Sequence, residues 1–164
     1  SEISGWSVVP VTVMREGPFG EGMVQEWIEI DGNVDLAEFY RTDDPQLRTL
    51  ALFDAVINNT DRKIGHLLPR SDGKLFGCDH GVTFHQDDKL RTVLWQWADK
   101  ELTLEEQEVL ANLLNRLLKQ RSDFLSYLSE SEFAALLTRI EDLIATKRFP
   151  VPSEEWPAIP WPPF

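Results

Sequence analysis

The first thirty residues carry the hydrophobic pattern of strands. Residues 7–13 (SVVPVTV) and 23–30 (MVQEWIEI) are rich in β-branched and aromatic side chains, and the stretch between them, REGPFGEG, has the glycines and the proline of a turn. Pro10 has no N–H to give to a neighbouring strand, so the first strand belongs at an edge or a bulge. The pattern predicts two strands joined by a hairpin-like loop.

From Asp43 onward the hydrophobic period becomes helical. The proline in DDP suits a first helical turn, and apolar positions recur every three or four residues as far as Ile57, where two asparagines end the pattern. Residues 103–121 start with a capping box, in which Thr103 precedes Glu106, and continue as an amphipathic pattern. Both stretches predict helices.

Residues 129–149 repeat the amphipathic pattern, with Ser129 or Ser131 as the cap. Between the first two helices, HLLPRSDGKLFGCD predicts a short strand, a turn at SDGK and a second short strand that ends at Asp79. The six prolines of the tail, residues 150–164, exclude a helix. We expect this tail to run extended and to pack back onto the helices.

The composition excludes two classes of protein. Sixteen Lys and Arg against twenty-eight Asp and Glu give a formal net charge of −12, the wrong sign for neutralising nucleic-acid phosphates. The one cysteine, Cys78, excludes an intrachain disulfide, and there is no basic-then-apolar leader and no run of about 18 apolar residues. We expect a cytoplasmic protein with no nucleic-acid partner and no transmembrane segment.

Two polar loops flank the predicted short hairpin: NNTDRKIGH at 58–66, the first loop, and CDHGVTFH at 78–85, the second loop. Asp61 and Asp79 each lie at an element boundary, and the hairpin between them folds one loop back toward the other. Two carboxylates suit phosphoryl transfer, in which one orients the attacking hydroxyl and the other holds the metal ions that offset phosphate charge. Position 66 is then the second metal ligand. Each aspartate taken alone also suits the capping of a helix or a turn.

The order helix, N-T-D-R-x-x-x-[N/H], short hairpin, D-x-G-x-x-F resembles the catalytic and metal-binding loops of the protein-kinase-like superfold. The similarity is greatest to type II phosphatidylinositol 4-kinases and to actinobacterial phosphatidylinositol 3- and 4-kinase-like proteins. Their loops read close to NTDRGNDN and DNGLAF, and here they read NTDRKIGH and DHGVTF. GMVQEWIE resembles their hinge, and LWQWADKELT resembles the segment after the metal loop. The resemblance spans about residues 22–114.

The resemblance implies an α+β, protein-kinase-like fold: a mainly helical C-terminal lobe with a small strand pair from the N-terminal lobe. Residues 1–30 are then remnant N-lobe strands and the hinge, residues 31–149 the helical lobe with both loops, and residues 150–164 the tail. The implied activity is an ATP-dependent phosphotransferase that uses Mg²⁺ or Mn²⁺. The implied acceptor is a phosphoinositide or a protein hydroxyl, and nothing in these residues chooses between them.

Site residues follow from the same resemblance. The catalytic residues are Asp61 and Arg62, the hinge residues that read the adenine are Gln25, Glu26, Trp27 and Ile28, and the metal ligands are His66 and Asp79. His66 replaces the usual asparagine of these kinases. Because imidazole is a softer donor than an oxygen, either the metal is less strictly magnesium or His66 donates a hydrogen bond and does not ligate. Arg62 and Lys63 either pair with substrate phosphate or pair with nearby carboxylates, and as a structural partner Arg62 would orient the loop.

One departure from these kinases is an absence. They anchor the nucleotide phosphates with a lysine upstream of the hinge, whereas here no lysine precedes Lys63. We therefore expect an N-terminal lobe to be missing from residues 1–164, and low activity from this chain alone. Two alternatives stay open: a pseudokinase or nucleotide-binding regulatory module without turnover, and a zinc-dependent hydrolase that uses His66, His80 and His85 with Cys78.

Overall fold

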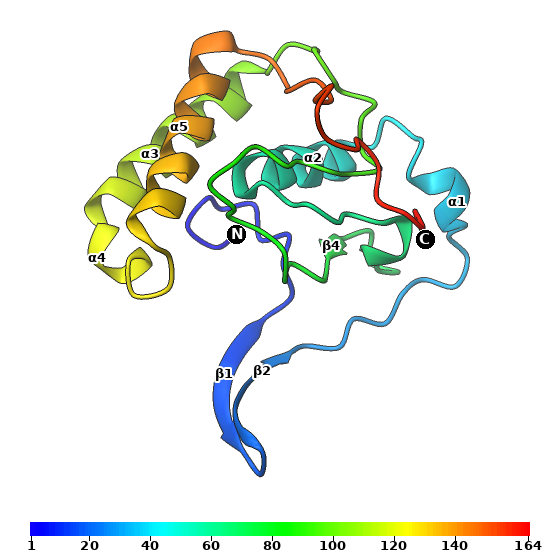
Figure 1. The fold of residues 1–164 in the computed structure, drawn as a ribbon. Helices are drawn as coiled ribbons and strands as arrows, with labels where there is room; N and C mark the ends of the chain where they lie inside the picture. Colours follow the sequence, from blue (N-terminus) through cyan, green and yellow to red (C-terminus); the bar gives the residue numbers. More distant parts are fainter.

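A hairpin of two antiparallel strands stands out from a helical body (Figure 1). The computed structural model describes residues 1–164, and the fold is α+β. Strands β1 (Thr12–Gly17) and β2 (Gly20–Gln25) pair in register from Thr12 opposite Gln25 to Gly17 opposite Gly20. The chain enters this hairpin from the body and returns to the body through residues 26–35, so the hairpin is tethered at its base alone.

The predicted bounds of these two strands were wrong. Most of REGPFGEG, expected as a loop, is strand, and the turn is confined to Pro18 and Phe19. Gly20 has a φ of 105°, which an L side chain rarely adopts, so the chain can reverse over two residues. Residues 26–30, expected as strand, leave the ladder after the bond from the Glu26 N–H to the Val11 carbonyl, 2.8 Å.

Residues 7–11, also expected as strand, lie before the ladder, and Pro10 is outside it. The Val8 side chain is buried in the main core, and its carbonyl accepts a 2.7 Å hydrogen bond from the Gly77 N–H. The run is therefore bound to the body at Val8, and only its last residue, Val11, bonds the chain that leaves β2.

Helix α2 (Pro45–Ile57) is the central element of the body. The Asp44 side chain caps its start by accepting from the Gln46 N–H at 2.7 Å, and Pro45 occupies the first turn, as expected. Asn58 ends the helix in the left-handed conformation, with φ 54°. A short helix, α1 (Leu36–Phe39), precedes α2.

Helices α3 (Leu104–Lys119) and α5 (Glu130–Thr146) pack against one another, joined through the short α4 (Arg121–Phe124), and α5 also packs on α2. Both predicted start signals are confirmed. Thr103 forms a capping box with Glu106, and Ser129, not Ser131, forms one with Glu132. Side chains from these helices and from α2 make one continuous core, whose most deeply buried members include Leu47, Leu50, Trp97, Leu110, Phe133 and Ile140.

A second, smaller hairpin lies against α2. The 3₁₀ turn η1 (Ile64–His66) leads into β3 (Leu67–Pro69), which pairs antiparallel with β4 (Leu75–Gly77). This hairpin was predicted, and its register places Leu67 opposite Gly77. The end of the first loop and the start of the second loop are therefore adjacent in space.

The tail, residues 150–164, forms no helix or strand and crosses the body to end beside the first loop (Figure 1). The Ala158 carbonyl accepts from the Thr92 N–H at 3.0 Å and from the Trp95 indole N–H at 2.8 Å, and the Pro163 carbonyl accepts from the Ile64 N–H at 2.8 Å. These bonds confirm that the tail packs back onto the body. None of the helices is long and apolar enough to cross a membrane.

Candidate functional site

The buried polar residues of the chain gather at one place. Only five polar or charged side chains are buried, and all belong to the first loop or to the segments packed against it: Asp54, Asn58, Asn59, Arg62 and Thr92. Burying a polar group costs free energy unless every donor and acceptor finds a partner, so such a concentration marks a region whose geometry is closely defined.

Arg62 and Asp54 form a fully buried ion pair. Both side chains are 0% exposed, and the guanidinium bonds the carboxylate twice, from Nε to Oδ2 and from Nη2 to Oδ1, each at 2.9 Å. Two parallel bonds of this kind fix the orientation of both groups. Asp54 lies in the last turn of α2, so the pair fastens the first loop to the central helix.

The two asparagines that open the first loop hold it on both sides. Asn58 donates to the His85 and Asp87 carbonyls at 3.0 and 2.7 Å and accepts from the Lys89 N–H. Asn59 donates to Asp54 at 2.9 Å. Asn58 therefore ties the start of the first loop to residues 85–89, and Asn59 ties it to α2.

Hydrogen bonds join the first loop to the second loop on both sides of the two predicted aspartates. Thr60, the residue before Asp61, donates from its N–H and its hydroxyl to the Val82 carbonyl, at 3.1 and 3.0 Å. Arg62, the residue after Asp61, donates from Nη1 to the Cys78 carbonyl at 2.8 Å. Because Cys78 and Val82 bracket position 79, the two loops are bound face to face.

The Asp61 carboxylate is flanked by two cations. Its Oδ2 lies 3.4 Å from Lys63 Nζ, and its Oδ1 lies 3.4 Å from an Arg91 guanidinium nitrogen, while the Asp61 N–H donates to the Asn59 side chain at 3.0 Å. The side chain is 26% exposed. Asp61 is therefore held in place yet open to solvent, in a local positive potential on a chain of net negative charge.

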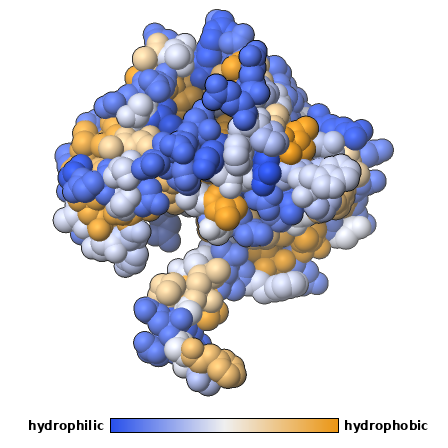
Figure 2. All heavy atoms as spheres, viewed as in Figure 1, coloured by the Kyte–Doolittle hydropathy of each residue, from blue (hydrophilic) through white to orange (hydrophobic).

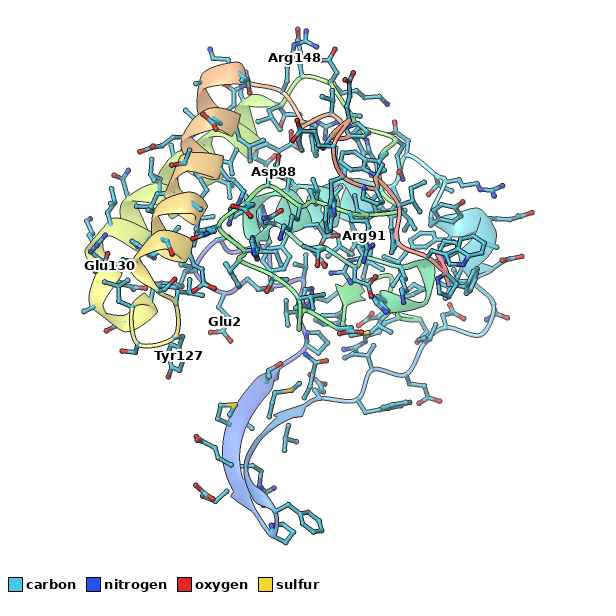
Figure 3. All side chains as sticks on the ribbon, viewed as in Figure 1. Glu2, Asp88, Arg91, Tyr127, Glu130 and Arg148 are labelled. Atoms are coloured by element: carbon cyan, nitrogen blue, oxygen red, sulfur yellow. The ribbon has the colours of Figure 1, made fainter.

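Arg91 is a site residue that no motif in the sequence marks. It lies near the middle of the body (Figure 3), on a segment whose backbone pairs with the first loop through a parallel bridge between Arg62 and Thr92. Its Nε donates to the Thr60 carbonyl at 2.7 Å, which aims the rest of the guanidinium at Asp61.

Asp79 is the more exposed of the two aspartates. It adopts the left-handed conformation, with φ 55°, and its side chain is 61% exposed. Its Oδ2 lies 3.5 Å from His66 Nε2. His66 Nδ1 faces the Lys63 N–H at 3.4 Å and so acts as an acceptor, which leaves the proton of the neutral ring on Nε2. This tautomer turns an N–H toward Asp79 and leaves Nε2 without a free lone pair for a metal ion.

Burial lowers the pKa of His66, and the positive charge of Arg62 lowers it further, against the carboxylates of Asp79 and Asp61, which raise it. The ring is therefore neutral at pH 7. The carboxylates of Asp61 and Asp79 therefore both lie near this one imidazole, in agreement with the bonds between the loops.

The donors present fit a divalent ion that arrives with phosphate groups and do not form a protein cage for an ion. No group of three or more His, Cys, Asp or Glu side chains converges in a way that could hold a metal. Mg²⁺ is commonly held by one or two carboxylates, with substrate phosphates and waters as the other ligands. Asp79, exposed and supported by His66, suits that role.

A cleft of ≈ 880 Å³ lies between the hinge residues and the loops. Its lining comprises Gln25, Glu26, Trp27, Ile28, Glu29, Ile30, Gly65, Leu68 and Cys78. The backbone N–H groups of residues 27–30 donate no hydrogen bond within the chain, so they are free to bind the edge of a flat polar ring. The four predicted hinge residues thus face the same space as Cys78, the neighbour of Asp79.

Two sequence assignments change. Arg62, assigned beside Asp61 as catalytic, is fully buried, and its side chain therefore cannot contact a substrate. The histidines do not converge on one point: His80 Nε2 bonds Arg62 at 2.6 Å, and His85 contacts Asp87 and Lys89. The zinc-hydrolase alternative has no geometric support.

The sequence interpretation missed Asp54 as a residue of the site. The available signal was its position, because an aspartate among the apolar positions of a predicted helix is expected to be buried and to need a partner.

Comparisons with known proteins establish a family but no activity. No family model matches the chain, and no solved structure matches it, so the kinase-like fold stays a prediction. Protein Rv2133c of Mycobacterium tuberculosis (strain ATCC 25618 / H37Rv) is 35% identical over an alignment 196 positions long, which covers 98% of this chain and 70% of that protein. The chain belongs to the same family as Rv2133c, whose name states no activity.

Proposed function

We propose that this protein is an ATP-dependent phosphotransferase, with the adenine against the hinge residues Gln25–Ile28 and the phosphates directed to Asp79. The supporting observation is that Asp61 and Asp79 lie on two loops joined at Thr60 and Arg62, the residues on either side of Asp61. A cleft with free backbone donors opens on the same loops. As a cytoplasmic enzyme it would draw on the cellular ATP pool.

In this proposal Asp61 orients the acceptor hydroxyl and accepts its proton as the oxygen attacks the γ-phosphorus. Its 26% exposure gives an acceptor access, and the cations of Lys63 and Arg91 flank the carboxylate and lie beside the charge that gathers on the transferred group. A magnesium or manganese ion, when bound, would draw charge from the phosphate oxygens. Asp79 would hold that ion, and His66 would orient Asp79 by donating from Nε2.

The acceptor that the family resemblance suggests is the hydroxyl of a phosphoinositide or of a protein serine or threonine. The cations beside Asp61 suit either acceptor. In both cases the acceptor oxygen attacks a negatively charged phosphate group. We carry both classes in the proposal, and acceptor screening with each would separate them.

We also propose that an N-terminal lobe outside residues 1–164 covers the β1–β2 hairpin. Apolar side chains on both faces of the hairpin are exposed, and Figure 2 shows it as a finger with apolar residues along it; the most exposed are Val11, Val13, Met14, Phe19, Met23 and Val24. Two strands alone are marginal in water and need a further layer.

The cleft can be tested through Cys78, the one cysteine of the chain, which lines it. ATP with Mg²⁺ or Mn²⁺ should slow alkylation of Cys78 about tenfold when the nucleotide is at ten times its Kd. The matched control is Asp79→Asn, which should lose the contribution of the metal and keep the weaker protection by ATP in EDTA. Unchanged alkylation at millimolar ATP with either metal would contradict the proposal.

Catalysis requires a separate test in the full-length protein. Asp61→Asn should lower phosphate transfer by about 10²- to 10⁴-fold, the usual contribution of a positioned general base, while ATP binding stays within a factor of two. Equal transfer rates in the variant and the wild type would remove Asp61 from its assigned role.

A pseudokinase or nucleotide-binding regulatory module is the second candidate. The observation that favours it is His66, which stands where these kinases usually carry the metal-binding asparagine. Under this reading ATP protects Cys78 as above, but the full-length protein transfers no phosphate to lipid, protein or water. Measurable turnover that Asp61→Asn abolishes would exclude it.

A further inference from the structure

We infer that Arg62 is a positioning residue that sets the place of Asp79 and, through it, the affinity for the divalent ion. This inference rests on the proposed function for the role of Asp79, but the contacts that carry it belong to the folded chain. A guanidinium in the first loop binds the residues on both sides of an aspartate in the second loop.

The first of these contacts is with the residue before Asp79. Arg62 Nη1 donates to the Cys78 carbonyl at 2.8 Å, and the Cys78 N–H in turn donates to the His66 carbonyl at 3.1 Å. The peptide unit that leads into Asp79 is therefore held from two directions by the first loop.

The second contact is with the residue after Asp79. Arg62 Nη2 lies 2.6 Å from His80 Nε2, and because an arginine can only donate, the ring nitrogen accepts and the ring is neutral with its proton on Nδ1. The His80 ring is also held edge-on by Phe53 of α2, with ring centroids 5.6 Å apart. Both neighbours of Asp79 are thus fixed, while its own carboxylate has one long contact and is 61% exposed.

The third contact anchors the guanidinium itself. Its bidentate bond to Asp54 ties it to α2, so movement of the second loop relative to Arg62 is movement relative to the central helix. A buried ion pair is seldom the most stabilising choice, since apolar side chains of similar volume often stabilise as well or better. Here the charged pair adds directional hydrogen bonds. The rigid guanidinium of Arg62 makes them both to α2 and to the second loop.

Gly77 makes room for this arrangement. A Cβ at that position would lie 3.2 Å from both Arg62 Nη1 and Nη2 and 3.0 Å from Leu50 Cδ1. Its φ is not in the left-handed region, so the backbone itself does not demand a glycine. A side chain at position 77 would press on the Leu50 side chain and on the guanidinium, which both lie against the strand that leads into Asp79.

The test compares Arg62→Lys with Arg48→Lys. Arg48, in the first turn of α2, also binds a carboxylate twice, that of Glu106 at the start of α3, at 2.7 and 2.8 Å. This pair lies outside the site, so Arg48 is the matched control. A lysine at 62 keeps the charge opposite Asp54 and loses the reach to the Cys78 carbonyl. The quantity measured is the Mn²⁺ concentration that gives half-maximal protection of Cys78 by ATP, with protection by ATP in EDTA measured beside it.

Arg62→Lys should raise that Mn²⁺ concentration by about 10- to 100-fold, as expected when the support of a metal ligand is removed, and change metal-free ATP protection less than twofold. Arg48→Lys should lower the melting temperature and leave the Mn²⁺ dependence unchanged. A folded Arg62→Lys variant with wild-type Mn²⁺ dependence would overturn the inference. Should that variant fail to fold, Gly77→Ala and His80→Phe disturb the same contacts, and the same rise in Mn²⁺ concentration is expected.

Hydrogen exchange on the nucleotide-free chain separates this inference from the proposed function. The amides of Thr60 and Cys78 join the two loops, and the amide of Phe84 joins the second loop to the end of α2. Loosening the second loop should speed exchange of all three by at least about tenfold in Arg62→Lys and not in Arg48→Lys. If the wild type binds no Mn²⁺·ATP but these amides respond, the proposed function fails while the positioning role of Arg62 stands. Unchanged exchange at all three amides would refute that role.

Discussion

Lowering the pH should destabilise the apo protein through His80 by a calculable amount. Burial lowers the pKa of His80 from 6.5 to about 4, and the neighbouring Arg62 charge adds to the effect. In the unfolded chain the same imidazole takes up its proton near pH 6.5. Between these values the unfolded state binds more protons than the folded state, so the stability present above pH 6.5 is lost as the pH falls toward 4. The difference corresponds to about 2.5 kcal/mol between pH 7.5 and pH 4.5.

The assay is urea unfolding of the chain in EDTA at pH 7.5 and at pH 4.5, compared with His80→Phe. The phenylalanine keeps the edge contact with Phe53 and removes the titrating group. Other groups, including His66, titrate in both proteins and cancel in the comparison. The wild type should lose about 2.5 kcal/mol more stability than the variant over this interval. Equal losses would show that His80 is not held neutral against Arg62, and the reasoning about that contact would be wrong.

Three further predictions concern the body, a helix cap and the hairpin. Asp54→Ala leaves the Arg62 guanidinium buried without its carboxylate and should cost about 3–5 kcal/mol in chemical denaturation; a loss under about 1 kcal/mol would contradict the buried-pair geometry. Thr103→Ala removes one capping box and should cost about 1 kcal/mol by the same method, with Ser126→Ala, outside any cap, as a near-neutral control. Backbone amides of β1 and β2 should exchange far faster than those of α2, because the hairpin is exposed on both faces; protection equal to that of α2 would show that the isolated chain covers it.

The helices of the body could be predicted from sequence because their signals are local. The proline at the start of α2, the capping boxes at Thr103 and Ser129 and the two asparagines at the helix end each act within one turn of chain. The structure confirms each of them. Local hydrogen bonds decide where these helices begin and end, whatever packs on them later.

The strands of the first hairpin were misplaced because composition does not say which neighbour a β-rich run will have. Residues 7–11 look like a strand, yet Val8 packs into the core and bonds Gly77, far along the chain. The glycine-rich stretch looks like a loop, yet most of it pairs in β1 and β2. Long-range contacts override β propensity in both cases.

The candidate site was only partly visible in the sequence for a similar reason. Asp61, His66 and Asp79 come from two loops whose hairpin connection could be predicted, and the bounds of β3 and β4 confirm that connection. Arg91 reaches Asp61 through a bridge between segments thirty residues apart, and nothing local marks it. Catalytic and metal-binding roles for these residues stay predictions.

The most direct test of the shared site uses Mn²⁺·ATP as a paramagnetic probe in nuclear magnetic resonance of the labelled chain. Because relaxation by Mn²⁺ falls steeply with distance and is visible even at low occupancy, weak binding by this chain is sufficient. We expect the amide signals of Asp61, Asp79 and Gly81 to broaden first, with those of α3 and α5 unaffected, and Asp79→Asn to abolish the effect. Broadening centred on another part of the molecule, or broadening at Asp79 that spares Asp61, would contradict the claim that the two carboxylates serve one nucleotide-bound ion.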